Sequence, residues 1–223
     1  MEEFYSVLLA CPLFQGIQRE DLPGMLGCLQ TRMLSVSKGQ TVFREGDTTV
    51  SIGIVLTGSL LLTREDYYGN RTIVAHIAPK EMFGESYALS DSQPLAVSIT
   101  AEEDSQLLLL DSRRIAGCCS NACSFHNQLI WNLLQIVATK NLMLHQKIQI
   151  TANRTTREKL MAYLSAQAKQ HGSRSFTIPF DRQALADYLE VDRSGLSAEI
   201  SKLRKEGVLA CRKNRFELLH FGE

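Results

Sequence analysis

The run of residues 180–203 constrains the fold of this chain most strongly, because it predicts a helix, a tight turn and a second helix. Ala184, Leu185 and Leu189 share one face of the first helix. The apolar side chains of the second helix repeat at i, i+4 and i+7: Leu196, Ile200 and Leu203. Asp192 is placed to accept the free N–H groups at the start of that helix. The pattern is that of a helix-turn-helix, although ordinary helical hairpins share it.

The segments on either side of the helix pair complete a winged helix. A helix is predicted over about 157–170, and 176–180 reads as a short strand. Residues 208–219 predict a β-hairpin with Lys213 and Asn214 at its tip. Because DNA-binding helix pairs place their second helix in the major groove, this part of the chain predicts double-stranded DNA as a partner.

The formal net charge of zero hides an asymmetry along the chain. Residues 1–150 carry 11 Lys/Arg against 15 Asp/Glu, a balance of −4, and residues 151–223 carry 13 against 9, a balance of +4. A basic C-terminal third suits a polyanionic partner. We therefore predict two domains, 1–150 for sensing and dimerisation and 151–223 for DNA binding.

The region from about 36 to 110 is predicted to be β-structure. Short apolar runs are separated by glycines: Gly39, Gly46, Gly53, Gly58, Gly69 and Gly84. Residues 54–62 hold two strands hinged at Gly58, and 72–77 and 107–110 are further strands. Many short strands with regular turn signals predict a barrel or jelly roll.

The pattern changes to helical over about 121–150. Six positions spaced 4, 3, 4, 3 and 4 form an a/d seam: Ile130, Leu134, Val137, Asn141, Leu144 and Ile148. Such a seam packs either on the chain's own barrel or on a second copy in a parallel coiled coil. The asparagine favours the dimer, since one polar seam residue fixes register at some cost in stability. Trp131 and Leu133 widen the apolar surface and are expected to touch the barrel, and 151–156 is a polar hinge.

Composition narrows the class of protein. Six cysteines in 223 residues are too sparse for a disulfide scaffold. No apolar stretch approaches the roughly 20 residues that a membrane span needs, and no secretory signal is visible. We therefore expect a soluble cytoplasmic protein without membrane contact.

Barrel, seam helix and winged helix follow one another as in the Crp/Fnr family of bacterial transcription regulators, which nearly the whole chain resembles. The motifs that carry the resemblance are Glu45-Gly46-Asp47, Leu56-Thr57-Gly58-Ser59-Leu60, Gly69, Phe83-Gly84-Glu85 and Asp192-Arg193-Ser194. The resemblance implies an α+β fold with an N-terminal cyclic-nucleotide-binding-like β jelly roll, a long dimerisation helix and a C-terminal winged helix-turn-helix. It also implies a homodimer on a pseudo-palindromic site, with recognition helices about 34 Å apart. An activator of this family would also contact RNA polymerase, but no segment identifies that surface.

The predicted DNA contacts lie on the second helix of the pair and on the wing. Arg193 can make a bidentate contact to guanine O6 and N7, and Ser194 and Ser197 face the same way. Phosphate contacts, which set affinity rather than sequence, are expected from Lys202, Arg182, Arg212, Lys213 and Arg215. Relatives often carry an arginine where this chain has Ala198, so specificity at that half-site position is expected to differ or be relaxed.

The effector region departs from the pattern of the cAMP-binding relatives. In those relatives Gly-Glu opens a phosphate cassette, and a following Arg-Ser pair holds the cyclic phosphate. Here Gly84-Glu85 is present, but Leu95-Ala96 stands at the Arg-Ser positions. Because a buried phosphate without a cation is costly, we predict an effector other than cAMP and expect Glu85 to cap the turn before Tyr87. The predicted pocket comprises Phe83, Gly84, Glu85, Leu95, Ala96, Met143 and Leu144.

An alternative signal input is a group of thiols. Cys119, Cys123 and His126 are spaced i, i+4 and i+7, so on one helix they could bind a metal or respond to oxidation. The simpler interpretation is that the cysteines pack as small apolar residues. The oxygen-sensing members of the family that the chain resembles hold an iron–sulfur cluster on a closely spaced run of cysteines near the N-terminus. Here only Cys11 and Cys28 lie there, so we do not expect that cluster.

An enzyme is a second class of function that the sequence allows us to weigh. A cupin-type barrel enzyme needs a His-x-His pair and a carboxylate for its metal, and His76 has no such neighbour. A barrel that regulates only a partner protein leaves Arg193 and the wing without a role. We therefore predict a regulator and not an enzyme; the sequence identifies neither the small-molecule effector nor a cofactor.

Overall fold

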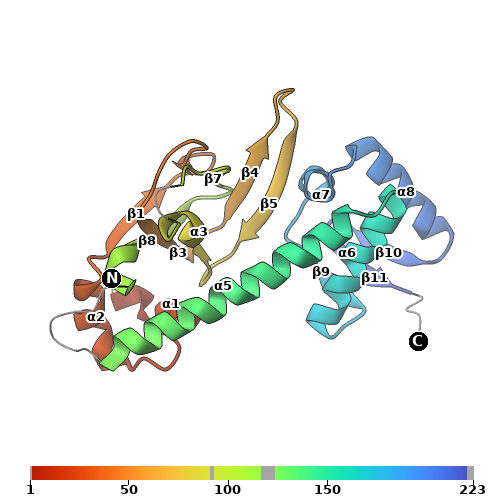
Figure 1. The fold of residues 1–223 in the computed structure, drawn as a ribbon. Coiled ribbons are helices and arrows are strands. Elements are labelled where there is room, and N and C mark those ends of the chain that lie inside the picture. The colour runs from red at the N-terminus through yellow and green to blue at the C-terminus, as the bar shows by residue number, and fades with distance from the viewer. Residues whose placement is uncertain (1, 91–92, 117–123, 220–223) are drawn as a thin grey trace. The chain divides into compact units, whose positions relative to one another are not determined.

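The computed structural model describes residues 2–90, 93–116 and 124–219. The chain divides into two compact units, residues 1–70 with 74–141 and residues 71–73 with 142–223. Figure 1 shows the order of the elements along the chain. Within the described ranges, no helix combines the length and the apolar character that a membrane span requires.

Short helices open the chain. They are η1 (Glu2–Phe4), α1 (Tyr5–Leu9), η2 (Pro12–Phe14), η3 (Arg19–Asp21) and α2 (Leu22–Cys28). Several of their apolar side chains, among them Leu8, Phe14 and Met25, are fully buried against one side of the barrel.

The predicted β region is a jelly roll of two four-stranded sheets, ordered β1-β8-β3-β6 and β2-β7-β4-β5. The elements are β1 (Arg32–Val36), β2 (Thr41–Phe43), β3 (Ser51–Thr57), β4 (Leu60–Glu65), β5 (Arg71–Ile77), β6 (Met82–Phe83), α3 (Glu85–Ala88), β7 (Ser98–Ala101), β8 (Ser105–Asp111) and α4 (Ser112–Ala116). The predicted hinge between two strands is confirmed at Gly58, whose φ of +79° suits glycine.

Strands β3 and β8 of the first sheet are buried on both faces, which explains why they are almost continuously apolar. Leu108 and Leu110 pack toward the N-terminal helices, whereas Leu107 and Leu109 point into the core between the sheets. Gly53 on β3 leaves room for an aromatic ring, because an added Cβ would lie 1.9 Å from Phe83.

A single long helix, α5 (Ser124–Thr151), follows the barrel. Leu133 is buried in the core cluster that the barrel strands share with the N-terminal helices, which agrees with the predicted barrel contact, but Trp131 is 58 % exposed and does not join that core. The Asn132 amide is also buried and donates to the carbonyl oxygens of Leu13 and Gln15, at 2.8 and 2.9 Å. These bonds fix the first half of α5 to the N-terminal segment.

The C-terminal unit has the predicted winged-helix order: α6 (Thr156–His171), β9 (Ser175–Thr177), α7 (Arg182–Leu189), α8 (Arg193–Lys205), β10 (Leu209–Arg212) and β11 (Arg215–Leu218). Its sheet is ordered β10-β11-β9. Thr155 and Glu158 form a reciprocal capping box at the start of α6. The buried residues Leu185, Leu189, Leu196, Ile200 and Leu203 pack the helix pair together.

Candidate nucleic-acid interface and effector site

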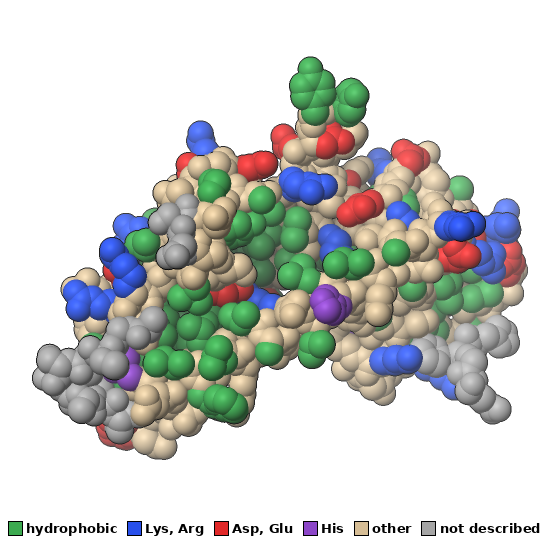
Figure 2. Space-filling model, in the orientation of Figure 1, with side chains coloured by type: hydrophobic (Ala, Val, Ile, Leu, Met, Phe, Trp, Pro, Cys, Tyr) green, Lys and Arg blue, Asp and Glu red, His purple; other side chains and the backbone are tan. Residues whose placement is uncertain are grey.

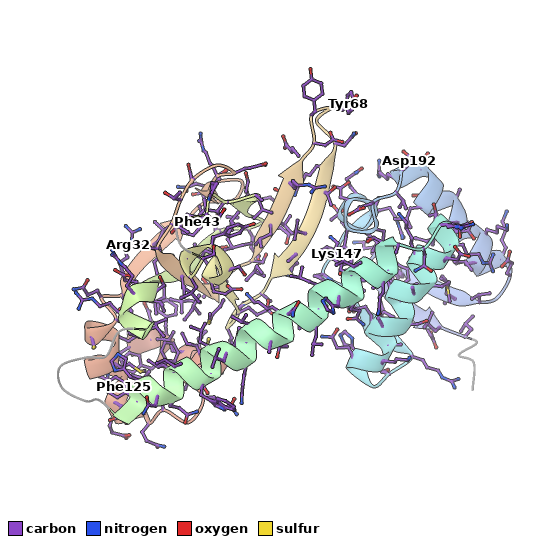
Figure 3. All side chains as sticks on the ribbon, viewed as in Figure 1. Arg32, Phe43, Tyr68, Phe125, Lys147 and Asp192 are labelled. Atoms are coloured by element: carbon purple, nitrogen blue, oxygen red, sulfur yellow. The ribbon has the colours of Figure 1, made fainter. Side chains whose placement is uncertain are left out.

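The start of α8 is fixed by Asp192, as predicted (Figure 3). Its carboxylate accepts from the Gly195 backbone N–H at 2.8 Å and from the Ser194 hydroxyl. Two hydrogen bonds, the larger effect coming from Ser194 and the smaller from the Gly195 N–H, hold the pKa of Asp192 below its usual range. The helix therefore begins on an ionised cap that defines where Arg193 and Ser194 leave the backbone.

The two sides of α8 differ in polarity. Leu196, Ile200 and Leu203 are buried, whereas the opposite side is exposed. The exposed residues are Arg193, Ser194, Gly195, Ala198, Ser201, Lys202, Arg204 and Lys205, and Ser197 is half-buried at the edge. This exposed face (the α8 face below) offers Arg193 at the first turn and basic side chains at the last.

The side chains predicted to contact phosphate differ in their exposure and in the contacts that they already make inside the protein. Arg212 and Lys213 are exposed at the wing, where Lys213 adopts a positive φ of +55° in the turn. The Arg215 guanidinium lies 3.3–3.4 Å from the Ser175 hydroxyl, and the Arg182 guanidinium carbon lies 5.7 Å above the Phe216 ring. Lys and Arg side chains lie among Asp and Glu side chains over this unit (Figure 2).

Arg157, which the sequence analysis missed, joins α6 to α8. Its guanidinium pairs with Glu199 at 3.3 Å and with Glu206 at 2.6 Å. The hydrogen bond to Glu206 raises the pKa of Arg157, and the same bond lowers the pKa of Glu206. Glu199 lies on α8, and Glu206 directly follows its last residue. The pairing neutralises both carboxylates, which would otherwise repel phosphate.

Glu85 does not cap the turn before Tyr87, so that expectation was wrong. Gly84 makes the turn with a φ of +79°, and the Glu85 carboxylate reaches Lys140 of α5 instead. Lys140 Nζ lies 2.8 Å from Glu85 Oε1 and donates to the Met82 carbonyl oxygen at 2.5 Å. Glu85 Oε2 is buried and has no hydrogen-bond partner among the described residues.

The residues predicted to line the pocket lie in different settings. Phe83 and Leu95 are buried in one core cluster between the sheets. The Ala96 side chain is exposed, and Met143 and Leu144 on the second half of α5 are also exposed. The position where the relatives place an arginine is therefore filled by a buried leucine.

Histidines of the N-terminal unit have partners in the backbone or in carboxylates. His76 Nε2 lies 3.2 Å from Glu102 Oε2, so a carboxylate partner accounts for the position of this histidine in the strand. His126 is buried, with Nε2 3.2 Å from the Arg114 carbonyl oxygen. Its predicted companions Cys119 and Cys123 lie outside the described residues, and the described part of the chain contains no cluster of three or more possible metal ligands.

The predicted seam of α5 is exposed in the single chain. Its apolar members, Ile130, Leu134, Val137, Leu144 and Ile148, are between 36 % and 62 % exposed. Asn141 is exposed among them. An apolar stripe of this length is unusual on a surface that faces water.

Comparisons with known proteins match both units. A cyclic nucleotide-binding domain model matches residues 33–122, and a Crp-like helix-turn-helix domain model matches residues 158–222. The nitrogen fixation regulation protein FixK of Rhizobium meliloti is 26 % identical over 213 residues, 95 % of this chain and 92 % of that protein. The transcriptional activator protein FnrL of Cereibacter sphaeroides is 26 % identical over 196 residues, 81 % and 73 % of the two chains.

A solved structure has the same fold. The c-di-GMP responsive global regulator CLP of Xanthomonas campestris superposes with a TM-score of 0.73 at 16 % identity. The match covers 92 % of this chain and all of that one.

Proposed function

The chain belongs to the Crp/Fnr family of DNA-binding transcription regulators, and from this premise we propose that it binds a pseudo-palindromic DNA site as a homodimer and answers to an effector other than cAMP. Residues 1–150 sense and dimerise, and residues 151–223 bind DNA in the cytoplasm. The observation that carries the proposal is the α8 face, on which Arg193 and Lys202 are exposed opposite a buried apolar side.

The proposed DNA contacts divide by role. Arg193, Ser194 and Ser197 meet base edges in the major groove. Lys202, Arg212, Lys213 and Arg182 meet phosphates, and Arg182 does so from its position over the Phe216 ring. Arg157 supports this contact indirectly by neutralising Glu199 and Glu206.

The proposed homodimer forms through α5. The exposed side chains of Ile130, Leu134 and Val137 continue into Leu144 and Ile148 on one stripe of the helix. A parallel coiled coil buries that stripe, and Asn141 sets its register. In sedimentation equilibrium we expect Leu134→Asp to yield monomers, while Leu142→Asp, 70 % exposed but off the stripe, leaves the dimer intact. A monomeric wild-type chain at micromolar concentration would contradict the dimer.

The proposed effector site lies around Phe83, Gly84, Glu85 and Leu95, with Ala96 as its outer member, whereas the predicted members Met143 and Leu144 belong to the other compact unit. Leu95 supplies no charge for a cyclic phosphate, and Lys140 is already paired with Glu85. Binding of cAMP would therefore bury a phosphate without a free cation. Another ligand would shift the population of α5 arrangements and thereby reorient the two recognition helices.

The test is a random-duplex selection with the full chain, followed by titration of the selected duplex with and without cAMP. We expect one enriched pseudo-palindrome and a DNA affinity that cAMP leaves unchanged. An affinity that rises several-fold in micromolar cAMP would contradict the effector proposal. The absence of any enriched sequence, in both reduced and oxidised protein, would contradict sequence-specific DNA binding.

A further inference from the structure

The middle of the α8 face has an unusual chemical pattern. Ser194, Ala198 and Ser201 are all exposed and spaced i, i+4 and i+7, so they form one strip along the helix. Arg193 lies at one end of the strip and Lys202 at the other. Between these two cations the strip consists of two hydroxyl groups and one methyl group.

Both hydroxyl protons of the strip are already used inside the protein. Ser194 donates to the Asp192 carboxylate, which is ionised and therefore only accepts. Ser201 donates to the Ser197 carbonyl oxygen at 2.9 Å, one turn back along α8. In this arrangement each serine offers its oxygen lone pairs to another partner while its proton is engaged inside the protein.

A strip that combines acceptor oxygens with a methyl group discriminates between base pairs through the methyl group. In the major groove a G·C pair displays the guanine acceptors N7 and O6 and the cytosine N4 amino donor, but no methyl group. An A·T pair displays the adenine N6 amino donor and, beyond the thymine O4 acceptor, the thymine C5-methyl group. The strip matches that pattern, because a serine oxygen can accept from N6 while the Ala198 methyl packs on the thymine methyl.

We infer that Ala198 reads a thymine methyl group within each half-site, at an A·T pair flanked on one side by the guanine that Arg193 contacts. The inference rests on the proposed function, since it assumes that α8 enters the major groove. Ala198 is thus a specificity-determining residue. The absence of an arginine there changes which base is preferred and does not merely weaken the preference.

The experiment replaces each thymine of one selected half-site with deoxyuridine, which removes only the C5-methyl group. At one thymine we expect the affinity of the wild-type protein to fall about fourfold, the value for burying one methyl group. Ala198→Gly should abolish the difference between thymine and deoxyuridine at that position alone. Ala198→Arg should instead select guanine there.

The matched control is Ala162→Gly on α6, which removes a half-buried methyl group from the same unit but away from α8. It should keep the fourfold ratio even if the stability of the unit falls. Because each variant is judged by the ratio of two affinities for one protein preparation, partial unfolding cancels.

The outcomes separate the two proposals. A selection without any enriched sequence overturns the proposed DNA function and this inference with it. An enriched site at which deoxyuridine is as good as thymine at every position overturns only the role of Ala198. The same holds if the ratio survives in Ala198→Gly.

Discussion

Two ion pairs, one in each unit, have similar geometry and different surroundings. Lys140 and Glu85 lie 2.8 Å apart, and their side chains are 29 % and 5 % exposed. Arg157 and Glu206 lie 2.6 Å apart, and theirs are 39 % and 36 % exposed. The comparison teaches that distance alone does not set the importance of a pair. Water already solvates the second pair, whereas the first holds a carboxylate that has lost its water.

The largest expected effect comes from removing the cation of the buried pair. Lys140→Met leaves the Glu85 carboxylate buried without a counter-charge, and the Met82 carbonyl loses a donor as well. We expect the free energy of unfolding to fall by about 3 kcal/mol, measured by urea denaturation at pH 7. A loss too small to measure would mean that the carboxylate is as well solvated as that of Glu206.

A double substitution sharpens this prediction. Lys140→Met/Glu85→Met replaces both charges with apolar side chains of similar volume, so no orphaned charge remains. We expect it to recover most of the loss and to lie within about 1 kcal/mol of the wild-type free energy of unfolding. If the double variant were as unstable as the single one, the loss would come from packing rather than from the unpaired carboxylate.

The buried pair also marks a limit of prediction from sequence. The apolar runs of β3 and β8, the hinge at Gly58 and the cap at Asp192 were predictable, because each depends only on residues that are close together in the sequence. Lys140 and Glu85 are 55 positions apart and meet only after α5 has packed on the barrel. From its neighbours in the sequence we expected Glu85 to cap the adjacent turn. In the folded chain its carboxylate pairs with Lys140 instead.

The exposed pair should have a smaller effect. Arg157→Ala removes contacts to Glu199 and Glu206, but water and salt already screen both. We expect the midpoint of thermal unfolding to be lower than in the wild type, by less than for Lys140→Met. The difference should shrink as salt is raised from about 0.05 to about 1 M, because the Debye length falls to about 3 Å at 1 M. A difference that does not respond to salt would show that Arg157 acts through packing.

The pH dependence of that pair gives the smallest effect. The pKa of Glu206 is held below its ordinary value of 4.5 by Arg157, so its charged form favours the folded state. The contribution is fully present above that value and is lost as the pH falls through the lower folded pKa. We expect the difference in unfolding midpoint between wild type and Glu206→Gln to be present at pH 7 and to vanish in acid. A difference that grows in acid would contradict this sign.

The seam of α5 shows a second limit. Its spacing was read from the sequence, and the buried Leu133 was found with it, but Trp131 stayed exposed. One position of a helix turns the side chain by about 100°, so neighbouring apolar residues reach different surroundings. Asn132 lies between these two positions, and its bonds to Leu13 and Gln15 could not be foreseen from periodicity because a polar residue breaks the apolar pattern.

The central claim is that the α8 face reads DNA, and the affinity of Arg193→Ala for the selected duplex tests it most directly. The matched control is Arg32→Ala, which removes an exposed arginine from β1 of the barrel. We expect Arg193→Ala to bind more weakly by about 1–3 kcal/mol and to tolerate any base at one position of each half-site, while Arg32→Ala binds as the wild type does. Equal losses for the two variants, with base preference unchanged, would contradict the claim.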